Sequence, residues 1–152
     1  KEEKQMINAA KKIISENKIC VLATCYNDLP NTSLMKYICD ESCFKIYMLT
    51  LKGSSKYQNI ERNPRVSLLI DTRESRPNGE GQIQALTIYG KANLIENSDW
   101  CKSITNDLVK KFVDLTPLSE NENCVVIEVC AESLLLLDSV DQSTYIDVLP
   151  PG

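Results

Sequence analysis

The sequence contains no histidine among its 152 residues. Without an imidazole, neither a Ser-His-Asp triad nor a Cys-His pair is available for nucleophilic catalysis. The seven cysteines include no pair at the CxxC spacing of common zinc sites, so we expect no metal site. Most of them fall in apolar, strand-like runs, as small core residues do in a reducing compartment. Cys39 and Cys43 either face each other across a turn or are two unrelated thiols.

An excess of positive charge and long apolar runs are also missing. The net charge is −4 and the basic residues are dispersed, so the chain has no electrostatic footprint for nucleic acid. No apolar run approaches the ~20 residues of a membrane span, and the N-terminal segment is typical of a charged helix rather than of a secretory signal. We therefore expect a soluble, cytoplasmic protein with neither nucleic acid nor a membrane as partner.

The length favours one folded domain. A chain of this size with 43% hydrophobic residues buries roughly two-thirds of its unfolded surface on folding. We assign residues 1–138 to the domain and residues 139–152 to a C-terminal tail that has turn residues but no clear partner within the chain. We expect this tail to be disordered, to cross to a partner subunit or to mark a truncation end. The chain begins at Lys1 without a methionine, which favours a cropped or processed protein.

Hydrophobic periodicity predicts helices and strands along the domain. Helical spacing of apolar residues predicts helices over residues 2–17, 54–62 and 100–113, the last with a buried stripe of Trp100, Ile104, Leu108 and Phe112. Strands are predicted over residues 19–25, 31–39, 44–50, 65–70, 83–95 and 123–129, with a further strand-like run over 131–138. Gly90 indicates a bend or bulge. Hairpin connections between these strands favour a small antiparallel barrel with flanking helices.

One long polar segment interrupts this pattern. Residues 72–82, which include Pro77, Gly79 and Gly81, show no periodicity. Because long structureless loops in compact domains often cover binding sites, we interpret this segment as a mobile loop and a candidate lid.

Residues 44–71 form the segment around which the chain is organised. They read as a strand, a small-polar loop, a short helix and a second strand, with Gly53, Ser54, Ser55 and Lys56 at the joint. Backbone N–H groups at a helix start carry partial positive charge, and two hydroxyls and an ammonium beside them suit a phosphate. Serines before a helix usually serve as simple caps, so this interpretation stands beside that of a phosphate site.

Four stretches resemble the pyridoxamine 5′-phosphate oxidase-like split barrels that bind FMN: VLATCYNDLPNTSLMKY, IYMLTLKGSSKYQNIERNPRVSLLI, LTIYGKANLIE and VVIEVCAESLLLLD. The resemblance covers residues 7–138. It is most specific in the second stretch, where Thr50, Ser54, Lys56, Asn59 and the run NPRVSL at residues 63–68 match in type and spacing. It implies a mainly β fold, a six-stranded antiparallel split β-barrel with flanking helices, and a homodimer with a flavin site at each subunit interface.

The resemblance also implies roles for single residues. The FMN phosphate would lie at Ser54, Ser55 and Lys56, Thr50 would contact the ribityl chain or the ring, and the backbone of residues 31–34 would line the isoalloxazine edge. Lys36 would lie near flavin and substrate and is the one catalytic candidate, although a lysine on a strand is more often a solvated edge residue. The expected cofactor-binding residues are Asn31, Thr32, Ser33, Leu34, Lys36, Thr50, Ser54, Ser55 and Lys56.

Departures from the family pattern bear on the reaction. Asn31 replaces a basic residue, Ser55 stands where the vitamin B6 oxidases have arginine, Ala85 stands near a flavin-contacting glutamine, and the C-terminal Arg and His substrate motif is missing. We therefore expect an FMN-dependent oxidoreductase that acts on a small-molecule substrate or electron donor, rather than an authentic pyridoxamine phosphate oxidase. The alternative is a noncatalytic module that holds a flavin, a haem or a deazaflavin as an electron carrier or sensor.

Overall fold

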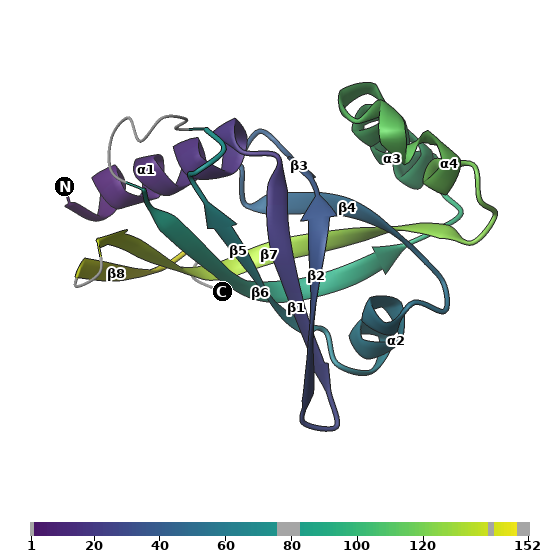
Figure 1. Cartoon of the computed structure of the whole chain (residues 1–152), viewed down its shortest axis with the longest axis horizontal. Coiled ribbons are helices and arrows are strands. Elements are labelled where there is room, and N and C mark those ends of the chain that lie inside the picture. Colours follow the sequence, from purple (N-terminus) through teal and green to yellow (C-terminus); the bar gives the residue numbers. More distant parts are fainter. Residues whose placement is uncertain (1, 76–82, 140–141, 149–152) are drawn as a thin grey trace.

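The computed structural model describes residues 2–75, 83–139 and 142–148 (Figure 1). None of the helices in these ranges is long and apolar enough to span a membrane. The elements are α1 (Glu2–Glu16), β1 (Ile19–Tyr26), β2 (Leu29–Lys36), β3 (Ile38–Cys39), β4 (Lys45–Leu51), α2 (Ser55–Arg62), β5 (Arg65–Asp71), β6 (Ala85–Ile95), α3 (Asp99–Lys111), the 3₁₀ helix η2 (Val113–Leu115), α4 (Thr116–Ser119), β7 (Cys124–Ser139) and β8 (Gln142–Asp147).

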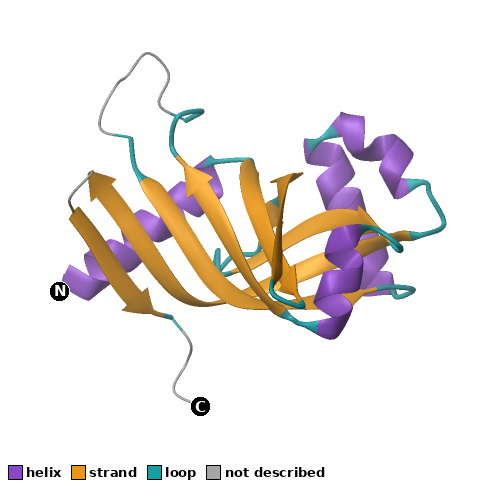
Figure 2. Ribbon diagram, turned by 60° about the horizontal axis from the view of Figure 1, so that its bottom comes forward, coloured by secondary structure: helices purple, strands orange, loops and turns teal. Residues whose placement is uncertain are grey.

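The described strands form one antiparallel sheet in the order β2-β1-β5-β6-β7-β4-β3, with β8 paired to β7. The sheet curves into a half-barrel, with α1 at one end and α2, α3 and α4 toward the other (Figures 1 and 2). The predicted fold class, a mainly β split barrel with flanking helices, is confirmed. The predicted count of six strands is too low, because the described residues form eight.

Two differences between the predicted and the observed strands concern where a strand is continuous and where it is divided. Residues 123–129 and 131–138 belong to one continuous strand, β7, because β6 pairs along nearly its whole length. The expected second strand is divided at Tyr37 instead. The backbone N–H of Tyr37 donates to the carbonyl of Lys18, and its buried hydroxyl donates to the carbonyl of Ile14. Tyr37 thus separates β2 from β3 by anchoring the chain to the end of α1.

The C-terminal tail supplies the remaining strand. We expected residues 139–152 to have no clear partner within the chain, and this is wrong for β8, which pairs with β7 from Ser133 to Ser139. The reason is that β4 pairs only with the first half of β7 and leaves the same edge free beyond Cys130. Ile146 of β8 is buried at this junction. Residues 140–141 and 149–152 lie outside the described residues.

Gly90 produces the predicted bulge. The register between β6 and β7 shifts between Tyr89 and Gly90. A Cβ atom at Gly90 would lie 2.2 Å from the carbonyl oxygen of Cys130, so only glycine permits this approach of the two strands.

The candidate lid falls mostly outside the described part of the chain, which omits residues 76–82. Its first residue, Thr72, lies beside Gln84, which follows the segment. The N–H of Thr72 donates to the carbonyl of Gln84, and the N–H of Gln84 donates to Oγ1 of Thr72. Whether the segment closes over a site stays a prediction.

Two apolar cores hold the sheet and its helices. The larger lies between the sheet and α1, which contributes Ala10, Ile13 and Ile14. The smaller joins β4 and β7 to α3, whose buried residues include Cys101, Ile104 and Leu108.

The predicted buried stripe of α3 is correct except for Trp100. Its side chain is 50% exposed and meets the Tyr47 ring edge-on, with 5.9 Å between the ring centroids. Ser98 caps α3 by accepting a hydrogen bond from the N–H of Cys101. This start places Cys101, three residues before Ile104, on the buried face and turns Trp100 toward its edge.

Cys39 and Cys43 lie together at the turn between β3 and β4. The turn is closed by hydrogen bonds from the N–H of Cys43 to the carbonyl of Asp40 and from the N–H of Asp40 to that of Lys45. Burial raises the pKa of the Cys39 thiol to about 11, and its interaction with the Cys43 thiol contributes. Both thiols are free, and their facing each other across the turn stays a prediction.

Candidate functional site

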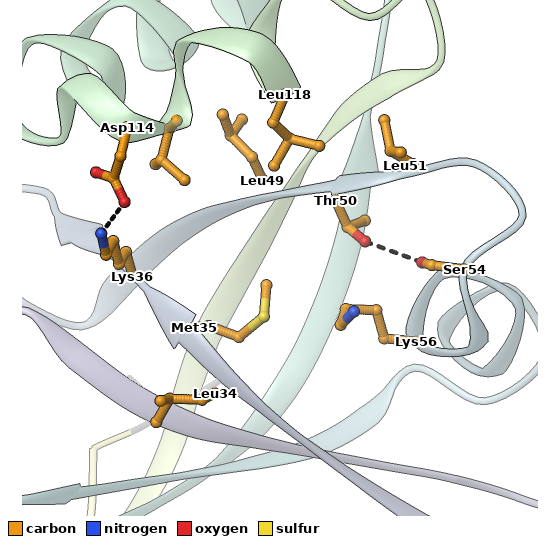
Figure 3. Close-up of a pocket in the computed structure, with 11 residues that line it drawn as sticks. Leu34, Met35, Lys36, Leu49, Thr50, Leu51, Ser54, Lys56, Asp114 and Leu118 are labelled. Carbon is orange, nitrogen blue, oxygen red and sulfur yellow. Dashed lines mark hydrogen bonds and ion pairs between the residues drawn. The ribbon is translucent and has the colours of Figure 1, made fainter.

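A cavity of about 380 Å³ lies where β2, β4, α2 and the segment after α3 meet (Figure 3). Its volume falls within the ~300–1,000 Å³ typical of small-molecule pockets. The side chains that line it are Leu34, Met35, Lys36, Leu49, Thr50, Leu51, Ser54, Lys56, Asp114, Leu115 and Leu118. The wall is therefore mostly apolar, with Lys56 at one end and the pair Lys36 and Asp114 at the other (Figure 3).

Ser54 defines the α2 end of the cavity. Gly53 has φ +91°, a left-handed conformation that turns the chain from β4 into the helix. Ser54 then caps α2, because its Oγ accepts a hydrogen bond from the N–H of Tyr57 at 3.2 Å. The same Oγ lies 2.9 Å from Oγ1 of the buried Thr50. The helix-cap interpretation of Ser54 is confirmed, and its phosphate contact stays a prediction.

The start of α2 retains hydrogen-bond donors. Helix geometry leaves the first four N–H groups without an intrahelical acceptor. Tyr57 donates to the cap hydroxyl, and the N–H of Gln58 donates to the carbonyl of Ser54. Within the described residues, the N–H groups of Ser55 and Lys56 have no acceptor, and the Lys56 ammonium forms no salt bridge. This end of the cavity therefore combines a helix N-terminus with an unpaired cation.

Two asparagines hold α2 against β1. Nδ2 of Asn59 donates to Oγ1 of the buried Thr24 at 3.0 Å, and Nδ2 of Asn63 donates to the carbonyl of Cys25 at 2.8 Å. The backbone N–H of Asn63 ends the helix by donating to the carbonyl of Asn59. Asn59 and Asn63, which both match the family pattern, thus position the helix relative to the sheet. The same contacts position Ser54 and Lys56 at the start of the helix.

Lys36 defines the opposite end. Its ammonium forms an ion pair with Asp114 and lies 5.7 Å from the centroid of the Phe112 ring. The hydrogen bond from Lys36 is the main cause that lowers the pKa of the Asp114 carboxyl. Lys36 is therefore held by the segment that follows α3, and is not a purely solvated edge lysine.

The structure brings together only part of the predicted site. Leu34, Lys36, Thr50, Ser54 and Lys56 line this cavity. Among the remaining predicted residues, Asn31 and Ser55 line a neighbouring cavity of about 340 Å³ beside the β1–β2 hairpin, and Thr32 and Ser33 line neither.

The wall formed by Asp114, Leu115 and Leu118 was not predicted from the sequence. The predicted helix ends at residue 113 and nothing is predicted for the next residues, whereas the structure has η2 and α4 there. Pro117 in the first turn of α4 is the local signal that could have indicated a helix start. Nothing local indicates that Asp114 reaches Lys36, which lies 78 residues away in the chain.

A curated relative shares part of this sequence. A Schizosaccharomyces pombe homologue of pyridoxamine 5′-phosphate oxidase is 40% identical over 70 residues, which cover 40% of this chain and 36% of that protein. The match thus spans about a third of the relative's own length.

Solved structures share the fold. General stress protein 26 from Bacillus anthracis superposes with a TM-score of 0.71 at 23% identity, over 95% of this chain and 99% of that one. A haem-binding protein from Mycobacterium smegmatis superposes with a TM-score of 0.78 at 13% identity, over 93% of this chain and 57% of that one. At these identities the likeness concerns the fold alone.

The family assignment follows from the sequence as a whole. The family model described as pyridoxamine 5′-phosphate oxidase matches residues 6–134, which include every strand from β1 to β6 and both ends of the cavity. The chain therefore belongs to the pyridoxamine 5′-phosphate oxidase family.

Proposed function

We propose that this protein binds FMN in the cavity between β2, β4 and α2 and acts as an FMN-dependent oxidoreductase on a small molecule. The observation that carries this proposal is the start of α2, at one end of a largely apolar cavity. There, among the residues that the structure describes, the Lys56 ammonium and the N–H groups of Ser55 and Lys56 have no partner. FMN combines a dianionic phosphate with a flat aromatic ring, and the two parts of the cavity suit these two parts of the cofactor.

The phosphate would lie at the first turn of α2. Charge-assisted hydrogen bonds from an ammonium and from backbone N–H groups are the strong interactions that anchor a phosphate. Lys56 would supply the charge, and the N–H groups of Ser55 and Lys56 would supply the directed donors. Ser54 already accepts from Tyr57, so its hydroxyl has one proton to donate, either to Thr50 or to a ligand.

The ring would lie along β2. This strand is at the edge of the sheet and pairs only with β1, so alternate backbone groups of residues 31–34 point away from the sheet. Leu34, Leu49 and Leu118 offer apolar surface on the cavity side. This arrangement supports hydrogen bonds to the ring edge from the backbone and packing of the ring face against leucines.

The chain's own residues would bind and orient rather than carry out acid–base steps. When bound, FMN supplies the hydride or electron transfer. Among the described residues that line the ring end, Lys36 carries the positive charge. Asp114 holds its ammonium in place through an ion pair. The leucines that line the cavity would exclude water from the reacting atoms.

We further propose that the protein is a homodimer with a cofactor site at each subunit interface. Leu34 on the edge strand is 74% exposed and lines the mouth of the cavity. A second subunit over β2 would cover this apolar side chain and close the open side of the cavity. The departures at Asn31, Ser55 and Ala85 support a reaction other than that of the vitamin B6 oxidases.

A noncatalytic cofactor carrier is the second candidate function. It is favoured by the fold similarity to a protein from Mycobacterium smegmatis described as haem-binding. This chain has no histidine, so a haem iron would need another axial ligand, such as cysteine, methionine or tyrosine. The phosphate-suited end at Lys56 favours FMN over haem.

The visible absorption spectrum of the purified protein tests these alternatives. A flavin spectrum that is bleached by NADH or NADPH supports the oxidoreductase. A flavin spectrum that no reductant or substrate changes supports the carrier. Colourless protein that added FMN does not stabilise against heat would contradict both, since a ligand that binds only the folded state must raise its stability.

A further inference from the structure

The two ends of the cavity differ in net charge. At the α2 end, the Lys56 ammonium has no anionic partner among the described residues. At the β2 end, the charge of Lys36 is cancelled by Asp114 (Figure 3). The surface between them is lined by leucines and Met35. Among the described side chains that line the cavity, the net positive charge thus lies at the α2 end.

Lys36 is held from two sides by one segment. Asp114 pairs with its ammonium, and the ring of Phe112, two residues earlier, lies 5.7 Å from the same nitrogen. Phe112 is buried in the smaller core, in the same cluster as Leu108. The backbone that carries Asp114 is thereby fixed next to Lys36.

We propose that Asp114 is a specificity-determining residue that fills the anion position on Lys36 from within the chain, so that this end of the cavity accepts an uncharged group. An anionic ligand would have to displace the Asp114 carboxylate from the Lys36 ammonium. An uncharged, largely apolar ligand meets the leucines without disturbing the pair. This inference rests on the proposed function, because it assigns a substrate class to the same cavity.

The Asp114→Asn variant tests the proposal. It removes the competing charge while it keeps the size of the side chain, so Lys36 becomes available to an anion. Inorganic phosphate is the probe, and its affinity is measured by NMR titration of each variant with and without FMN. Asp107→Asn on α3 is the matched control, because Asp107 is exposed, lines none of the described cavities and carries the same charge. Thermal melting of each variant verifies that it is folded.

We expect Asp114→Asn to raise the phosphate affinity about fivefold, the effect of freeing one partly exposed charge. We expect Asp107→Asn to change it less than twofold, roughly the effect of a distant, screened charge. The double variant Lys36→Met with Asp114→Asn should lose the gain. No gain in Asp114→Asn, an equal gain in the control, or a gain that survives the loss of Lys36 would each overturn the proposal. Because the gain is measured with and without FMN, it is independent of whether FMN binds.

Discussion

The hydroxyl groups of Thr50 and Ser54 lie 2.9 Å apart and share one hydrogen bond. Thr50 is buried near the end of β4, whereas Ser54 is the N-cap of α2. The bond therefore fixes where the helix begins relative to the strand. Because Lys56 lies in the first turn after this cap, the same contact sets the position of the cavity's unpaired cation.

Replacing Ser54 by alanine should affect both stability and cofactor binding. The loss of an N-cap costs about 1 kcal/mol of unfolding free energy. If the Ser54 hydroxyl also contacts the FMN phosphate, as we propose, its loss should weaken FMN binding about tenfold. Urea unfolding measures the first effect, and quenching of flavin fluorescence measures the second.

Ser98→Ala provides the matched control. Ser98 caps α3 with the same geometry, since its Oγ accepts from the N–H of Cys101 at 3.0 Å, but it lies outside the candidate cofactor cavity. It should lower the stability by a similar amount and leave FMN affinity unchanged. Equal loss of FMN affinity in both variants would mean that Ser54 acts only through the fold.

Gly90→Ala should strongly destabilise the protein. A Cβ at this position would lie 2.2 Å from a backbone carbonyl oxygen of β7, so two paired strands would have to separate. We expect a loss of about 3 kcal/mol, or roughly 10 °C in melting temperature. Gly53→Ala is the comparison, because nothing lies within 4 Å of its Cβ position and only the positive φ opposes the change. It should cost about 1 kcal/mol, and a cost as large as that of Gly90→Ala would contradict the steric argument.

Cys20 should contribute to a loss of stability in alkali. Burial raises the pKa of its thiol from 9.0 to about 12. At a pH above 9.0, the pKa of this thiol in the unfolded chain, the unfolded chain has released the proton while the folded chain still keeps it. The unfolding free energy therefore falls as pH rises. One such group contributes about 1.4 kcal/mol per pH unit in this window, and the contribution is fully present only below the unfolded pKa. Cys20→Ala should therefore show a shallower decline in urea unfolding between about pH 9 and about pH 11, and an unchanged slope would contradict the assignment.

Leu34→Glu should separate the proposed dimer. A charge on the exposed edge strand would be buried and unpaired against a second subunit, at a cost of several kcal/mol. Light scattering after size exclusion should then report a monomer that has lost FMN affinity. Tyr145→Glu is the control, because Tyr145 is also exposed but lies on β8, which pairs with β7 and not with β2 (Figure 1). A dimer that survives Leu34→Glu would place the interface elsewhere.

Features with a local cause were predictable from the sequence. The cap at Ser54, the end of α2 at Asn63-Pro64 and the bulge at Gly90 each depend on a residue type that the backbone requires at that point. The start of α3 was predicted within one residue, and Ile104, Leu108 and Phe112 are buried as predicted. Trp100 is not, because successive steps of four residues drift by about 40° around a helix and carry it to the edge of the buried face.

Features that depend on distant partners were not predictable. The polar sequence of β8 becomes a strand because β4 leaves an edge of β7 free. Likewise, Asp114 reaches Lys36 only once α3 has packed on β4 and β7. The same limit applies to the site, since Ser54 and Ser55 are adjacent in the chain but line different cavities on the two sides of α2.

The central claim is that the first turn of α2 holds the FMN phosphate, and the Lys56→Ala variant tests it most directly. FMN and riboflavin differ only in the phosphate, so their dissociation constants separate contacts to the phosphate from contacts to the ring. We expect the variant to weaken FMN binding about 10- to 100-fold through the loss of a charged hydrogen bond, and to leave riboflavin binding unchanged. Lys91→Ala, which removes an exposed lysine on β6, should change neither. Equal loss for FMN and riboflavin in Lys56→Ala would contradict the account.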